Sequence, residues 1–101
     1  FCNIVNSILE ENTIFARIGG EEFCITFINK TVNESKIISE EIRNKCQNNI
    51  ILIDDNKIQF TISLGLSFRN NFSSIDEILQ VSDELLYKAK RNGRNRLIIS
   101  Q

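Results

Sequence analysis

Two groups of residues in this chain have the types and spacing needed to bind a phosphate together with its metal ion. One group could hold the metal ion, and the other could bind the phosphate oxygens. Two adjacent carboxylates, Glu21 and Glu22, directly follow the glycine pair Gly19 and Gly20. Backbone without side chains beside paired acids suits such an ion, because Mg²⁺ prefers carboxylate oxygens. An acidic hairpin tip also has a simpler interpretation, a solvated turn that keeps a sheet edge soluble. Both interpretations stay open on these residues alone.

The second group is basic and lies near the C-terminus. Lys90 and Arg94 are four residues apart around the predicted end of a helix. Cations at a helix C-terminus often only complement the helix dipole, which is worth about 0.3–1 kcal/mol each. A phosphate site needs both carboxylates that hold a metal and fixed cations that neutralise the remaining oxygens. The sequence supplies these two parts on different elements.

Composition excludes several kinds of function. The chain of 101 residues contains no histidine, which excludes histidine catalysis and a Cys-His nucleophile. A net charge of −1 gives no general electrostatic reason to bind nucleic acid or a membrane surface. No apolar run approaches the roughly 20 residues needed to span a bilayer. Cys2, Cys24 and Cys46 lack zinc-site spacing and predict reduced, buried thiols in a cytosolic setting.

The acidic pair needs a hairpin to present it. Residues alternate in polarity on both sides of the glycines, which predicts two strands within residues 13–29. A two-residue turn at Gly19 and Gly20 would join them, because the turns of tight hairpins need positive φ. This turn would place Glu21 and Glu22 at the exposed tip of the hairpin.

Three helices are predicted. An apolar stripe at i, i+3 and i+4 spacing predicts the first over residues 1 to about 12, and since no capping residue precedes it, we expect the domain to begin upstream. Capping boxes open the other two, at Thr31 and Ser74. We interpret the middle helix as an amphipathic crossover with a solvated charged face that ends near Asn49. Gly93 is a natural residue to end the last helix.

Three further strands complete the predicted elements. Residues 50–53 predict a short strand, followed by a turn at Asp54–Asn56 whose aspartates are more simply turn residues than metal ligands. The clearest strand covers Ile58–Phe68, where every second residue is apolar. Gly65 within it predicts a bulge or a close approach by another segment. A last strand at 96–99 completes an α+β sandwich, whose helices pack on a sheet with antiparallel character.

Three motifs of the chain resemble those of one family. Gly-Gly-Glu-Glu-Phe at 19–23, in register with Ala16-Arg17-Ile18, resembles the GGDEF (or GGEEF) signature of diguanylate cyclases. Thr-Ile-Ser-Leu-Gly at 61–65 is similar to the T-x-S-x-G strand of that family. Residues 82–95 resemble its A-D-x-A-L-Y-x-A-K-x-x-G-R-N ending, with Ser82 and Leu85 in place of alanines. The resemblance covers the whole chain and is specific, because the motifs occur in the same order.

The resemblance implies a fold and a reaction. The implied fold is an α+β, palm-like nucleotidyl cyclase (ferredoxin-like) sandwich without its first strand and helix, so that residues 1–101 are a partial GGDEF domain. The implied reaction condenses two GTP molecules into cyclic di-GMP and pyrophosphate. It would use two Mg²⁺ ions per half-site, with Mn²⁺ as an alternative, in a homodimer of cytoplasmic domains, and the parent protein could carry a membrane anchor.

The resemblance also implies roles for individual residues. Glu21 would bind the metal and help to deprotonate the 3′-hydroxyl, and Glu22 belongs to the same catalytic signature. The glycine pair would let the backbone approach the nucleotide, and two cations would bind the GTP phosphates. These four nucleotide-binding residues are Gly19, Gly20, Lys90 and Arg94.

Two departures from the family pattern carry expectations of their own. The R-x-x-D of the family's product-inhibition site falls on residues 10–13, which read Glu-Glu-Asn-Thr, so we expect no feedback binding of cyclic di-GMP there. A second metal-binding aspartate and the guanine-binding residues would lie upstream of Phe1. We therefore expect residues 1–101 alone to be inactive, and to oligomerise or borrow a strand.

Two other functions stay open. One is a catalytically silent GGDEF-like module that binds GTP and regulates a neighbouring signalling domain, such as a phosphodiesterase. The other is a structural α+β interaction domain whose motifs are coincidental. Mg²⁺-dependent GTP binding that is lost in Glu21→Ala would eliminate the second alternative.

Overall fold

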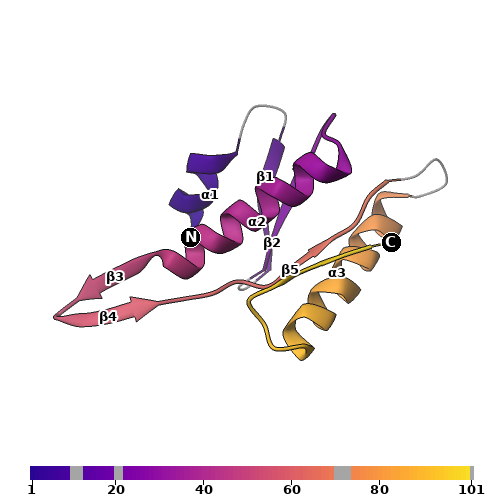
Figure 1. Cartoon of the computed structure of the whole chain (residues 1–101). Coiled ribbons are helices and arrows are strands. Elements are labelled where there is room, and N and C mark those ends of the chain that lie inside the picture. The colour runs from indigo at the N-terminus through magenta and orange to yellow at the C-terminus, as the bar shows by residue number, and fades with distance from the viewer. Residues whose placement is uncertain (10–12, 20–21, 70–73, 101) are drawn as a thin grey trace.

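The computed structural model describes residues 1–9, 13–19, 22–69 and 74–100. Within these ranges the chain confirms the predicted α+β class, with three helices and six strands (Figure 1). In chain order they are α1 (Cys2–Ile8), β1 (Thr13–Gly19), β2 (Glu22–Phe27), α2 (Val32–Asn48), β3 (Ile50–Ile53), β4 (Asn56–Gln59), β5 (Leu64–Leu66), α3 (Ile75–Arg91) and β6 (Leu97–Ile99).

The strands pair in three separate two-stranded sheets, not in the single sheet that the sequence predicted. β1 and β2 are antiparallel, β3 and β4 form a second antiparallel hairpin, and β5 and β6 are parallel. In Figure 1, α2 crosses in front of β1 and β2, and the β3–β4 hairpin extends away from the other elements. Helix α3 packs on β5 and β6.

The predicted long strand over Ile58–Phe68 is wrong in its middle. Its first part belongs to β4, which pairs with β3 as far as Gln59, and its last part is β5, which pairs with β6. Between these strands, Phe60 and Ile62 pack against the core. The alternation separates an apolar face from a small, polar one, but it cannot show that the two ends of the stretch have different pairing partners.

The core lies between α1, α2 and the β1–β2 hairpin. Val5, Ile42 and Cys46 are its fully buried side chains, and Phe15 and Ile25 of the hairpin pack against them. Burial raises the pKa of the Cys46 thiol. The predicted burial of all three cysteines is wrong at Cys2, which is exposed.

Helix α1 is shorter than predicted. It ends at Ile8, and Leu9 has extended backbone angles (φ −69°, ψ 133°). Its first residues have no side-chain cap, as expected from the sequence. The part of the prediction that falls on residues 10–12, including most of the R-x-x-D position, lies outside the described residues.

The predicted capping box is present at Thr31, whereas at Ser74 the structure shows only the bond to the N-cap side chain. Thr31 and Glu34 form a reciprocal capping box, in which the Glu34 backbone N–H donates to Thr31 Oγ1 and the Thr31 backbone N–H donates to Glu34 Oε1, both at 3.1 Å. These bonds to Thr31 hold the pKa of the Glu34 carboxyl below its ordinary value. At the start of α3, the Glu77 backbone N–H donates to Ser74 Oγ at 3.2 Å.

Gly65 allows α3 to lie directly on β5, which confirms the predicted close approach. A Cβ at this position would overlap the Ser82 carbonyl oxygen and the Leu86 backbone nitrogen. The neighbouring hydroxyl of Ser67 donates to the Ile78 carbonyl at 2.8 Å and also bonds the Ser82 hydroxyl. The small, polar face of this stretch is therefore the face that α3 covers.

The described helices are all too short or too polar to cross a membrane.

Candidate functional site

The acidic side of the candidate site is the link between β1 and β2. Gly19 ends β1 and pairs with Glu22, which begins β2, after a register shift between Arg17 and Gly19. The predicted Gly-Gly turn includes Gly20 and therefore lies partly outside the described residues. Gly20 and Glu21, the central residues of the signature, lie outside the described residues.

The described residues of this turn are open to solvent. Glu22 is exposed, and a Cβ built on Gly19 would meet no atom within 4 Å. The described backbone at Gly19 is therefore open to the close approach of a ligand, and its nucleotide-binding role stays a prediction.

The basic side is the end of α3 and the loop that follows it. The Asn92 backbone N–H donates to the Lys88 carbonyl and the Arg94 backbone N–H to the Ala89 carbonyl, both at 2.9 Å. The second bond and the positive φ of Gly93 (121°) are those of a Schellman motif, so the predicted helix end is confirmed. Lys90 is half-buried in the last turn and Arg94 is exposed beyond it.

An open cleft joins the two sides. It has a volume of about 930 Å³, and both Glu22 from β2 and Lys90 from α3 line it. The structure thus brings together one residue from each predicted group. Arg94 is not among the described lining residues. The others are Asp83, Glu84, Leu86, Tyr87, Lys88, Arg91 and Asn92.

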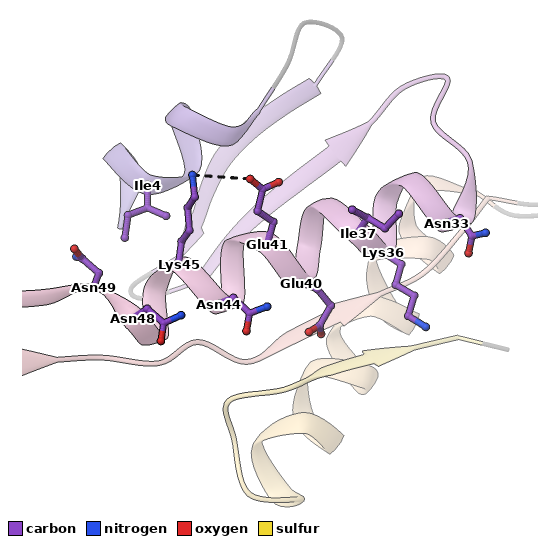
Figure 2. Close-up of a pocket in the computed structure, with 10 residues that line it drawn as sticks. All are labelled: Ile4, Asn33, Lys36, Ile37, Glu40, Glu41, Asn44, Lys45, Asn48 and Asn49. Atoms are coloured by element: carbon purple, nitrogen blue, oxygen red, sulfur yellow. Dashed lines mark ion pairs between the residues drawn. The ribbon is translucent and has the colours of Figure 1, made fainter.

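Figure 2 shows a second cavity, of about 960 Å³, on a different part of the molecule. Its lining comes from α2 and the residue after it, together with Ile4 of α1. An ion pair between Lys45 Nζ and Glu41 Oε1 (3.9 Å) lies at its edge. None of the predicted site residues that the structure describes lines this cavity, so its size alone does not connect it to the motifs.

The described residues contain no group of three or more His, Cys, Asp or Glu side chains that could hold a metal. The predicted metal ligand, Glu21, lies outside them, so the metal site stays a prediction. Mg²⁺ is commonly bound by one or two carboxylates plus substrate phosphates, and a site of that type needs no cluster of three. Of the two signature carboxylates, the structure describes only Glu22, which is exposed and lines the cleft.

Sequence reasoning missed Arg43 on α2, which it assigned to a solvated face. The Arg43 side chain is only 17% exposed, and its Nη1 donates to Asn95 Oδ1 at 3.0 Å. Asn95 belongs to the loop after α3, directly after Arg94. An arginine on an otherwise exposed helix face gives no sequence signal for a partner 52 residues away.

Comparison with known proteins agrees with this architecture. Residues 1–96 match the family described as "Diguanylate cyclase, GGDEF domain". The chain therefore belongs to the GGDEF domain family, as its motifs indicated. Diguanylate cyclase A of Treponema denticola is 35% identical over 99 residues, which are 97% of this chain and 27% of that protein. The chain thus spans about a quarter of the length of that relative.

Solved structures show the same fold. The GGDEF domain of DgcB from Caulobacter crescentus, a structure in complex with c-di-GMP, superposes with a TM-score of 0.90 at 26% identity and covers 96% of this chain and 58% of that one. The active GGEEF domain of a diguanylate cyclase from Vibrio cholerae gives a TM-score of 0.81 at 30% identity, covering 99% and 64%. The predicted GGDEF fold is confirmed over this part of the domain.

Proposed function

We propose that this chain is part of a diguanylate cyclase domain that condenses two GTP molecules into cyclic di-GMP and pyrophosphate. The observation that carries the proposal is the open cleft, which is lined both by Glu22 of the GGEEF signature and by Lys90 at the basic end of α3. Membership of the GGDEF family supports it, because the family is described by diguanylate cyclase activity and the relative with 35% identity is named Diguanylate cyclase A.

In the proposed reaction, the 3′-hydroxyl oxygen of one GTP attacks the α-phosphorus of the other. The bond from this phosphorus to the oxygen that bridges the α- and β-phosphates breaks, pyrophosphate leaves, and the hydroxyl proton is lost. The 3′-hydroxyl of the second nucleotide then attacks the α-phosphorus of the first in the same way, which closes the ring and releases a second pyrophosphate. Bound Mg²⁺ would supply charge stabilisation at the α-phosphate and the leaving group. Glu21 would hold the metal and help to accept the proton, and Lys90 and Arg94 would neutralise phosphate oxygens.

The reaction requires two GTP molecules whose reacting groups face each other. Each domain would bind one of them, so catalysis needs a homodimer of domains. The rate of product formation per mole of protein should then rise with protein concentration in the dilute range. It should level off once nearly all of the protein is dimeric. A specific activity that is independent of concentration, in protein shown to be monomeric, would contradict this part of the proposal.

The direct test is turnover of Mg²⁺-GTP by protein that contains the complete domain, measured for the parent and for Glu21→Ala. We expect cyclic di-GMP from the parent and none above background from the variant. Glu41→Ala is the matched control, because it removes the same charge from an exposed site on α2, away from the cleft. If the parent binds GTP but forms no product, the regulatory-module alternative replaces this proposal.

Residues 1–101 on their own should form no product, because the resemblance assigns further metal and guanine ligands to an upstream segment. We also expect this chain alone to associate through unpaired strand edges, since its sheets have only two strands each in the described residues. Light scattering after size-exclusion chromatography tests this. A monodisperse monomer with cooperative unfolding would contradict the association.

A further inference from the structure

Arg43 is fixed in place by neighbours on its own helix. Its Nε and Nη2 both donate to Glu40 Oε2, at 3.2 and 2.9 Å, and Nη2 also donates to Asn44 Oδ1 at 3.0 Å. A guanidinium is planar, so two bonds to one carboxylate oxygen set the direction of its remaining arm. That arm, Nη1, donates to Gln47 Oε1 at 3.3 Å and to Asn95 Oδ1 at 3.0 Å.

The loop that receives this bond has an unusual backbone. Gly93, Arg94 and Asn95 have φ values of 121°, 63° and 46°, so three successive residues are in the left-handed half of conformational space. Residues other than glycine adopt these angles at a cost, and they persist where the surroundings hold them. Arg94 and Asn95 therefore need bonds that maintain their conformation.

Two of these bonds come from the loop itself and from α3. The Arg94 backbone N–H donates to the Ala89 carbonyl at 2.9 Å, and Arg96 Nε donates to the Arg94 carbonyl at 3.1 Å. A third bond comes from a separate element, α2, where Arg43 Nη1 donates to Asn95 Oδ1 at 3.0 Å. Within the described part of the chain, this bond links the side chains of α2 to the loop.

We infer that Arg43 is a positioning residue for Arg94: its bond to Asn95 fixes the left-handed loop and with it the direction in which Arg94 leaves the end of α3. This inference rests on the proposed function, in which Arg94 binds GTP phosphates. Arg43 does not itself line the cleft, so its effect passes through Asn95. Glu40 takes part by holding the guanidinium plane.

The test compares Arg43→Lys and Asn95→Ala in protein that contains the complete domain. Lysine keeps the charge but lacks the rigid planar fork, so it does not hold Glu40 and Asn95 in the fixed directions that the guanidinium sets. We expect the KM for GTP to rise about fivefold in each variant, as for the loss of one hydrogen bond, with kcat within about twofold. The double variant should be no worse than either single one. Lys45→Ala, which breaks an exposed ion pair on the same helix, is the control and should leave KM unchanged.

A second measurement does not depend on GTP. Hydrogen exchange at the Arg94 amide should be about tenfold faster in Arg43→Lys than in the parent or in Lys45→Ala, because loss of the anchor lets the loop open. If exchange and KM are both unchanged, the inference is overturned. Asn95→Ala tests the same bond from the loop side if Arg43→Lys is too unstable to purify.

Arg94→Ala separates the two proposals. If it raises the KM for GTP while Arg43→Lys does not, Arg94 binds the nucleotide and the positioning inference alone is wrong. If Arg94→Ala leaves KM unchanged although exchange in Arg43→Lys is faster, the loop is anchored as described but the assigned phosphate-binding role of Arg94 fails, and the inference fails with it.

Discussion

Gly19 and Arg94, on the two sides of the proposed nucleotide site, have contrasting surroundings. A side chain at Gly19 would meet no atom within 4 Å, and its strand partner Glu22 is exposed. Arg94 lies in a loop that is bonded to α3, to Arg96 and, through Asn95, to α2. Hydrogen bonds within the protein thus hold the backbone of the basic side in place without a ligand. The described acidic side instead presents open backbone that a nucleotide can approach.

This contrast suggests that the two sides of the site have different roles in nucleotide binding. Fixed cations lower the cost of ordering when a phosphate binds, which favours affinity. Open backbone at the acidic side leaves room for the nucleotide and its metal ions. Substitutions at the two sides should therefore separate stability from binding, and the predictions below are ordered from the largest expected effect to the smallest.

Gly65→Ala should cause the largest loss of stability. Its Cβ would overlap backbone atoms of Ser82 and Leu86, and backbone cannot move aside as a flexible side chain can. Forcing α3 away from β5 should lower the free energy of unfolding by about 3 kcal/mol, at the upper end of the usual cost of overpacking. Denaturant titration measures this, and a change below about 0.5 kcal/mol, the range of ordinary surface substitutions, would show that α3 is less tightly seated than described.

Gly19→Ala should have the opposite effect to Gly65→Ala, with little change in stability but weaker GTP binding. Space around Gly19 is open and its φ is not among the positive values, so the free energy of unfolding should change by no more than about 0.5 kcal/mol. Binding of GTP should nevertheless weaken, because the methyl group occupies the space through which the nucleotide would approach the backbone. Isothermal titration of Mg²⁺-GTP alongside denaturant unfolding tests both halves. Unchanged affinity would remove Gly19 from the proposed site.

The smallest effect concerns α2, which carries Arg43, and depends on pH. The pKa of Glu34 is lowered by its bonds to Thr31, so this carboxylate stabilises the fold above the pKa of the unfolded chain, about 4.3 for a free glutamate. That contribution is lost as the pH falls through the lowered pKa of the folded state. Glu34→Gln keeps an oxygen for the cap but does not titrate there.

The parent should therefore lose stability relative to Glu34→Gln as the pH is lowered from about 6 to 3, as thermal unfolding across this range would show. Glu41→Gln, an exposed carboxylate of the same helix, corrects for general acid effects. A difference between parent and Glu34→Gln that stays constant with pH would mean that the capping box contributes nothing that titrates.

Much of this fold was predictable because its signals are local. The caps at Thr31 and Ser74, the helix end at Gly93 and the close approach at Gly65 each depend on residues within a few positions or on a missing side chain. The family resemblance then supplied the fold, whereas the site residues that it implied stay a prediction. These predictions needed no knowledge of which distant segments meet.

The errors arose where pairing or contact is non-local. Alternation over Ile58–Phe68 could not show that β4 and β5 pair with different strands. The register shift between Arg17 and Gly19 was not predicted either, because strand register depends on both partners. Arg43 was assigned to solvent since nothing near it in sequence points to Asn95.

The central claim is that the acidic turn and the basic end of α3 act on one nucleotide. Its most direct test is the affinity for GTP, with and without Mg²⁺, of the complete domain and of Glu21→Gln and Lys90→Gln. We expect Mg²⁺ to strengthen binding by the parent, Glu21→Gln to lose that dependence, and Lys90→Gln to bind more weakly with the dependence retained. Unchanged GTP affinity in Lys90→Gln, or full Mg²⁺ dependence in Glu21→Gln, would contradict the account.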